Sequence, residues 1–145
     1  RNPLATRPWQ HVLEPLSGYL TLASQLEHNI NLNGEAFNFG PDKQQNHTVK
    51  QLITELIAYW PGSNWIDNSL IDSILHEADL LQLDCNKALD ILKWKSTLDF
   101  KETAKWTSEW YRSYYKESPD MILDITIDLI SSLSFHSSFI ISVNV

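Results

Sequence analysis

The alternation of apolar and polar residues is clearest over residues 48–60, where it predicts an amphipathic helix. Thr48, followed three residues later by Gln51, forms the capping-box pattern that starts a helix. Pro61 and Gly62 then predict where the helix ends. Between these signals the apolar residues recur at helical spacing and form one stripe: Val49, Leu52, Ile53, Leu56, Ile57 and Trp60.

A second helix is predicted over residues 15–29, after an extended segment. Pro8 keeps Arg7 out of the helical region, and Pro15 suits a first helical position because its missing N–H would be unpaired there. Gly18 weakens a helix by roughly 1 kcal/mol relative to Ala, so we expect a close packing neighbour. A part of the protein outside this chain is one candidate for that neighbour. The helix carries one apolar stripe: Leu16, Tyr19, Leu20, Ala23 and Leu26.

Three more helix starts are predicted in the second half of the chain. Asp84 precedes a short apolar-rich helix, and Asp99 with Glu102 forms another capping box. The sequence Ser-Pro-Asp at residues 118–120 places an acid in the first turn, where the helix dipole favours it. The helix after Asp99 is expected to present one face: Phe100, Ala104, Thr107, Tyr111 and Tyr114.

Other segments are predicted to be extended or carry a mixed pattern. Residues 36–39 predict a buried strand that ends at Gly40 and Pro41, and residues 75–83 predict a further extended piece. Beyond residue 120 the apolar spacing fits a helix and a strand equally. The aromatic group of the second half is expected to be core rather than a sugar-stacking platform: Trp106, Trp110, Tyr111, Tyr114 and Tyr115.

Composition indicates one globular domain that does not bind nucleic acid or an anionic membrane. The chain has 145 residues, 43% of them hydrophobic, and a net charge of -7, whereas such partners require clustered Lys and Arg. No apolar run approaches the roughly 18–20 residues that span a bilayer. The single cysteine, Cys85, suits a reducing compartment and is expected to be a packed small residue. We therefore expect a cytoplasmic protein.

The segment RPWQHVLEPLSGYL (residues 7–20) holds the first candidate for binding. An arginine on an extended segment beside a helix start is well placed to meet an anion. From the spacing alone, Arg7 fits an ordinary surface ion pair as well, and such pairs are the more frequent case. The histidines show no metal-ligand spacing, so no metal site is predicted: His11, His28, His47, His76 and His136.

Residues 7–20 resemble the C-terminal half of the CDP-glucose 4,6-dehydratase family, which belongs to the extended short-chain dehydrogenase/reductase superfamily. Three further stretches match in the same order. They are FNFGP (residues 37–41), HEA (residues 76–78) leading to LDCNKA (residues 83–88), and TSEWY (residues 107–111). The first motif is specific to the family, and the others recur across the superfamily.

The resemblance implies that this chain contacts a nucleotide sugar, CDP-glucose. Arg7 then occupies the position from which relatives reach the diphosphate, and a guanidinium fork suits that task. Glu77 falls where relatives carry an acid that accepts hydrogen bonds from the ribose hydroxyls, although a solvated surface acid is an equal alternative. Relatives carry a second diphosphate arginine where this chain has Ile74, and His76 is expected to replace it in part as a donor.

The resemblance also implies an NAD-dependent enzyme, a lyase that removes water across C5 and C6 of the sugar between oxidation at C4 and reduction at C6. Its product is a 4-keto-6-deoxy sugar nucleotide for bacterial surface polysaccharide such as O-antigen. The chain has no glycine-rich phosphate turn and no Tyr-x-x-x-Lys pair. NAD and the catalytic residues are therefore expected in the N-terminal half of a full-length homodimer, and this chain alone is expected to be inactive.

We thus predict the helix-rich C-terminal substrate-binding subdomain of an extended short-chain dehydrogenase/reductase, an α/β fragment with a few short strands. Residues 1–130 form the nucleotide-sugar-binding domain, and residues 131–145 form an atypical tail of unknown role. Lys93 stands where the family usually has glycine, at a cost of about 1 kcal/mol if φ is positive there. Another NAD-dependent nucleotide-sugar dehydratase or epimerase, and a non-catalytic helical interaction module, remain alternatives.

Overall fold

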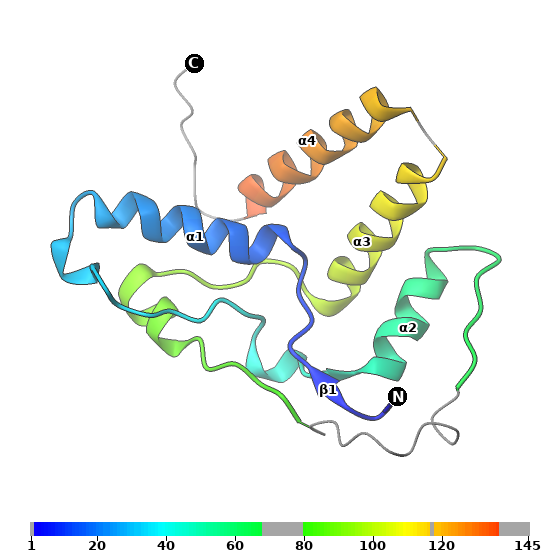
Figure 1. Cartoon of the computed structure of the whole chain (residues 1–145), viewed down its shortest axis with the longest axis horizontal. Coiled ribbons are helices and arrows are strands. Elements are labelled where there is room, and N and C mark those ends of the chain that lie inside the picture. Colours follow the sequence, from blue (N-terminus) through cyan, green and yellow to red (C-terminus); the bar gives the residue numbers. More distant parts are fainter. Residues whose placement is uncertain (1, 68–79, 117, 137–145) are drawn as a thin grey trace.

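The computed structural model describes residues 2–67, 80–116 and 118–136, and helices dominate it (Figure 1). In chain order the elements are β1 (Thr6–Arg7), α1 (Leu13–Leu26), η1 (Ile30–Leu32), η2 (Lys43–Gln45), β2 (His47–Thr48), α2 (Val49–Ala58), η3 (Ala88–Leu92), α3 (Phe100–Tyr114) and α4 (Pro119–His136). The prediction of a helix-rich chain with short strands is confirmed, while its assignment to the superfamily fold stays a prediction.

The strands form one small sheet. β1 pairs antiparallel with β2, with Thr6 opposite Thr48 and Arg7 opposite His47. On the other side of β1, Thr6 forms a parallel bridge with Leu80. The N-terminal segment therefore lies between two stretches that come from distant parts of the sequence.

The helix starts predicted at Thr48, at Asp99 and at residues 118–120 are confirmed, whereas α1 begins at Leu13 instead of Pro15 and ends at Leu26 instead of Asn29. Thr48 caps α2 and Asp99 caps α3, and in both cases the side chains complete the reciprocal capping box with Gln51 and Glu102. Pro119 begins α4, which continues as a helix to His136 and so resolves the mixed pattern beyond residue 120. The two capping boxes depend on side chains three residues apart, which is why a local pattern predicts them.

The strand predicted at residues 36–39 is wrong. This segment is irregular, and its carbonyls are bonded by side chains instead of a neighbouring strand. Gln10 Nε2 donates to the Phe39 carbonyl at 2.9 Å, and Lys87 Nζ donates to the Ala36 carbonyl at 2.9 Å. Phe39 is buried in a core cluster with Leu32, Ala88, Leu92 and Trp94.

The predicted aromatic core of α3 is also wrong in part. Tyr111, Tyr114 and Tyr115 are exposed, whereas the buried residues of α3 are Phe100, Thr103, Ala104 and Ser108. Small residues lie inside because α2 packs closely here, and Ser108 Oγ donates to the Leu56 carbonyl at 3.1 Å. The tyrosines consequently stay on the outer side of the helix, whereas Trp106 and Trp110 are half-buried and contact His11 and Thr126.

The backbone at Lys93 and the packing at Gly18 match what the sequence led us to expect. Lys93 has φ 57° and ψ 24°, a left-handed conformation in which glycine is favoured, so the family position does carry the expected cost. Gly18 is buried in α1, and a Cβ atom built on it would lie 2.3 Å from Cδ1 of Phe39. The close neighbour of Gly18 is therefore within this chain, at residue 39, and no outside segment is needed to explain the glycine.

We predict that Gly18→Ala destabilises the chain, although alanine is the better helix former. The added methyl group would overlap the Phe39 ring, and overpacking of this kind costs about 1–3 kcal/mol. Urea unfolding should show a lower midpoint. Ser24→Ala, at an exposed position of the same helix, should change stability by less than about 0.5 kcal/mol. A Gly18→Ala variant as stable as the parent would show that Phe39 does not constrain this position.

Candidate functional site

The segment that carries Arg7 is held from both sides. Trp9 Nε1 donates to the His47 carbonyl at 2.9 Å, beside the β1–β2 pair. Gln10 Nε2 donates to the Phe39 carbonyl, on the opposite side of the segment. Sequence reasoning missed both anchors, although Trp9 and Gln10 belong to the specific motif. Their side chains fix the path of the backbone between β1 and α1.

Arg7 itself is partly buried on β1. One guanidinium nitrogen, Nη1, donates to the Thr6 carbonyl at 2.7 Å, which folds the side chain back along its own strand. Its neighbour across the sheet is His47, whose ring stacks on Phe100 with a centroid distance of 3.8 Å. The guanidinium thus belongs to a paired strand instead of a loop.

The other predicted site residues, His76 and Glu77, lie outside the described residues, as does Ile74. The structure does describe where their segment ends. Leu80 pairs with Thr6, one residue before Arg7, and the Leu81 N–H donates to the Thr6 carbonyl at 3.4 Å. The chain that follows the HEA motif therefore comes to the same short strand as the arginine.

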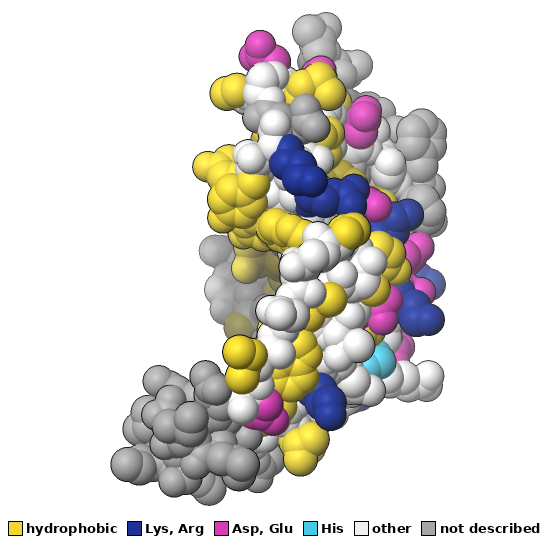
Figure 2. Space-filling view, turned by 90° about the vertical axis from the view of Figure 1, so that its right-hand side faces the viewer, with side chains coloured by type: hydrophobic (Ala, Val, Ile, Leu, Met, Phe, Trp, Pro, Cys, Tyr) yellow, Lys and Arg dark blue, Asp and Glu magenta, His cyan; other side chains and the backbone are white. Residues whose placement is uncertain are grey.

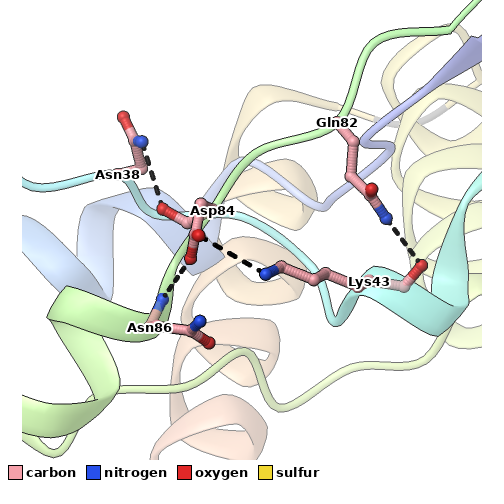
Figure 3. Close-up of polar contacts among 5 residues, drawn as sticks. All are labelled: Asn38, Lys43, Gln82, Asp84 and Asn86. Atoms are coloured by element: carbon pink, nitrogen blue, oxygen red, sulfur yellow. Dashed lines mark hydrogen bonds and ion pairs between the residues drawn. The ribbon is translucent and has the colours of Figure 1, made fainter.

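A cluster of polar contacts fixes residues 82–86 after that strand pairing (Figure 3). Asp84 is central, because its Oδ1 accepts from the Asn86 N–H at 3.0 Å and its Oδ2 lies 3.4 Å from Lys43 Nζ. Its carbonyl accepts from Asn38 Nδ2 at 3.1 Å, and Gln82 Nε2 donates to the Lys43 carbonyl at 2.9 Å. The Asn86 hydrogen bond, followed by the Lys43 charge, lowers the pKa of Asp84, which stabilises its ionised form.

Glu14 is the other unusual group of the motif. It is only 1% exposed, and its Oε1 accepts from the backbone N–H groups of Thr97 at 2.8 Å and Leu98 at 2.6 Å. Its Oε2 is buried with no hydrogen-bond partner among the described residues. Burial raises the pKa of the Glu14 carboxyl above its usual value, although the two backbone hydrogen bonds oppose that rise. No local sequence pattern marks this glutamate as buried, because its two N–H partners are more than eighty residues away in the chain.

His11 and Cys85 are both neutral packing groups. Burial lowers the pKa of His11, its Nδ1 accepts from the Leu13 N–H at 3.3 Å, and its ring meets Trp106 edge-on. Burial raises the pKa of the Cys85 thiol, which disfavours the nucleophilic thiolate. The prediction that Cys85 is a packed small residue is consistent with its position beside Gly40.

Two cavities border the motifs in the described part of the chain. One of about 580 Å³ opens between residues 40–45 and residues 83–96, and Lys43 and Lys95 are among its polar groups. The other, of about 470 Å³, lies between residues 10–13 and helices α3 and α4 and is lined mainly by apolar side chains. Lys43 is already paired with Asp84, so the first cavity presents less positive charge than its residue types suggest.

The described residues do not fit the phosphates of NAD. A glycine-rich turn between a strand and a helix would be needed. Gly18 is inside α1, Gly40 packs on Leu83, and Gly34 and Gly62 lie in separate turns with open space around them. Among the described residues there is also no group of three His, Cys, Asp or Glu residues that could hold a metal ion, and no helix with the length and apolar character to cross a membrane.

Comparison with curated proteins identifies this chain as similar to part of a dehydratase that acts on a nucleotide sugar. That relative is CDP-glucose 4,6-dehydratase from Salmonella typhimurium (strain LT2), which is 38% identical over 117 residues. The match covers 77% of this chain and 32% of the relative, so the chain spans about a third of the relative's length. No protein-family profile matches the chain. The resemblance deduced from the motifs is therefore confirmed.

We predict that the stability contributed by Glu14 falls as pH rises. Its pKa is raised in the folded state, so between the ordinary value near 4.5 and the raised value the folded chain binds more protons than the unfolded chain. Glu14→Gln removes this titration and keeps an oxygen for the Thr97 and Leu98 N–H groups. The free energy of unfolding of Glu14→Gln, relative to the parent, should increase with pH across that window.

The control for this experiment is Ser24→Ala, which changes an exposed side chain without a charge on the same helix. Its stability should follow the pH dependence of the parent protein. Denaturant unfolding at a series of pH values measures both variants. A difference between Glu14→Gln and the parent that stays constant with pH would show that the buried carboxyl does not titrate abnormally.

Proposed function

We propose that this chain is the substrate-binding portion of an NAD-dependent nucleotide-sugar 4,6-dehydratase, and that it binds the CDP-glucose part of the site. The similarity to the Salmonella enzyme supports this proposal, together with the motif order along the chain. The observation that carries it is the position of Arg7, on a strand that is anchored by Trp9 and Gln10 and paired with the end of the HEA segment. Arg7 supplies the charge for the diphosphate.

In this proposal the residues of the chain bind and orient, and they hold no reacting atom. The guanidinium of Arg7 offers N–H groups to the diphosphate oxygens, which gives charge-assisted hydrogen bonds. Glu77 accepts hydrogen bonds from the ribose diol, and His76 donates to the diphosphate in place of a second arginine. NAD supplies the hydride chemistry when it is bound by the part of the enzyme that this chain does not span. The full-length enzyme is proposed to be a cytoplasmic homodimer.

We predict that Arg7→Ala weakens binding of CDP-glucose by roughly 10- to 100-fold in an enzyme that contains the complete site. A charge-assisted hydrogen bond contributes about 1.5–3 kcal/mol, and each 1.4 kcal/mol corresponds to about tenfold in affinity. Arg7→Lys keeps the charge but loses the planar fork, so it should recover only part of the loss. A single-chain chimera, in which this chain replaces the matched third of the Salmonella relative, provides that enzyme for calorimetry.

Arg112→Ala is the matched control, because Arg112 on α3 also donates from Nη1 to a backbone carbonyl, that of Tyr59 at 3.1 Å. This variant should leave the affinity for CDP-glucose unchanged and affect only stability. If Arg7→Ala binds CDP-glucose within twofold of the parent chimera, Arg7 has no diphosphate role and serves the strand alone.

A further inference from the structure

The turn that follows η1 contains the dipeptide Asn33-Gly34, and both of its residues are exposed. Asn33 has φ -66° and ψ 122°, whereas Gly34 has φ 82° and no atom within 4 Å of the place where a Cβ would be. Before the dipeptide, the Asn33 N–H donates to the Ile30 carbonyl at 3.0 Å. After it, the Glu35 N–H donates to the Leu32 carbonyl at 3.1 Å. The peptide group between Asn33 and Gly34 therefore lies between two hydrogen-bonded neighbours.

This peptide group differs from its neighbours in its hydrogen bonds. Within the described part of the chain, neither the Asn33 carbonyl nor the Gly34 N–H has a hydrogen-bond partner, and the Asn33 side-chain amide has none either. Water is then the partner of these groups, because backbone donors and acceptors are almost always paired. Glycine also tolerates backbone angles that a side chain would exclude. The peptide can therefore rotate so that the Gly34 nitrogen approaches the Asn33 side chain.

We propose that Asn33 is a site of spontaneous modification, at which the side-chain amide is converted to a carboxylate through a cyclic imide. The backbone nitrogen of Gly34 forms a bond to Cγ of Asn33, and the side-chain nitrogen takes up the proton of the Gly34 N–H and leaves as ammonia. Water then opens the imide. Opening at Cγ gives aspartate, and opening at the main-chain carbonyl gives isoaspartate, whose main chain runs through Cγ. The reaction takes up one water, releases one ammonia and needs no oxidant or reductant.

Asn31, in the adjacent η1, provides a comparison within the same chain. Asn31 is exposed as well, but the residue that follows it is Leu32, which is 4% exposed and belongs to the core cluster. The Leu32 N–H donates to the Asn29 carbonyl at 3.1 Å. Ring closure at Asn31 would break this hydrogen bond and displace a buried side chain. The fold therefore opposes the reaction at Asn31 and permits it at Asn33.

The turn joins two fixed points, so the modification changes the structure beyond residue 33. On one side Leu32 is held in the core cluster. On the other side Lys87 Nζ donates to Glu35 Oε2 at 2.6 Å and to the Ala36 carbonyl at 2.9 Å, and it lies 4.7 Å from the centre of the Phe37 ring. Isoaspartate adds a carbon atom to the main chain between these points. We expect the longer main chain to loosen the contacts of Lys87.

Both products also add a negative charge next to this lysine. The side of the molecule that faces the viewer in Figure 2, toward α2 and α3, mixes Lys and Arg with Asp and Glu side chains. The turn lies at the opposite end of the molecule from α2 in Figure 1. There the Lys87 ammonium is already paired with Glu35. A new carboxylate two residues away competes for the same ammonium, in a chain whose net charge is -7.

The test is incubation of the folded chain in mildly alkaline buffer, followed by peptide mass spectrometry that locates the exchange of –NH2 for –OH. Conversion at Asn33 should be at least about tenfold faster than at Asn31, because Gly34 has no Cβ to hinder ring closure. Its rate in the folded chain should lie within about tenfold of the rate in guanidinium chloride, because no bond holds the peptide. Asn33→Gln should abolish the reaction at this position, whereas Asn31→Gln should leave the rate at Asn33 unchanged. Equal rates at Asn33 and Asn31, or a larger slowing by the fold, would overturn the proposal.

A second measurement tests the effect on the fold. Anion exchange separates the modified chain from the parent by its added charge, and urea unfolding compares the isoaspartate form with the variant Asn33→Asp. That variant carries the same charge on an unaltered main chain. The isoaspartate form should unfold at a lower urea concentration than Asn33→Asp, and equal midpoints would contradict the inference that the turn joins two fixed points. Neither measurement uses NAD or a nucleotide sugar, so the result does not depend on the proposed function.

Discussion

The buried carboxylate of Glu14 is the interaction on which the arrangement of this chain depends. It comes from the first turn of α1 and accepts two backbone N–H groups from the turn that leads into α3, more than eighty residues later. Burying a carboxylate with one unpaired oxygen costs free energy of folding. Losing the two N–H groups on the other oxygen would raise that cost further, so the fold depends on keeping them. Through it, the motif at the start of α1 is tied to the second half of the chain, and the polar side of α1 is held inward.

The Glu14 contact lies between two features of the motif, namely the strand that carries Arg7 and the exposed apolar stripe of α1. On the N-terminal side of Glu14, the backbone from β1 is held by Trp9 and Gln10, which places Arg7 at the sheet where Leu80 arrives. On the C-terminal side, the same orientation of α1 leaves its apolar stripe exposed. The backbone that follows Arg7 and the exposed stripe of α1 thus belong to one segment, which Glu14 ties to the second half of the chain.

Local signals in the sequence predicted the local structure well. The capping boxes at Thr48 and Asp99 require only side chains three residues apart, and both formed as expected. The left-handed conformation of Lys93 meets the condition that the family resemblance raised, since glycine is usual at that position in the family. By contrast, the strand predicted at residues 36–39 was wrong because its carbonyls are bonded by the side chains of Gln10 and Lys87, which lie far away in sequence.

The sequence also did not predict the buried contact of Glu14 or the direction in which the apolar stripe of α1 faces. Periodicity identifies an apolar stripe but does not say which neighbour covers it, and here no described element does so fully. For the candidate site, the sequence named Arg7, His76 and Glu77 from resemblance. The structure describes the strand that carries Arg7, and the ligand contacts of all three residues stay predictions.

The most direct test of the account is the nucleotide preference of the single-chain chimera. The purified protein would be supplied with NAD and, in parallel, with CDP-, GDP-, UDP- and dTDP-glucose, and formation of the 4-keto product would be measured. The account predicts product from CDP-glucose in clear preference to the others. A folded chimera that binds NAD but forms no product from CDP-glucose, or that prefers another nucleotide, would contradict it.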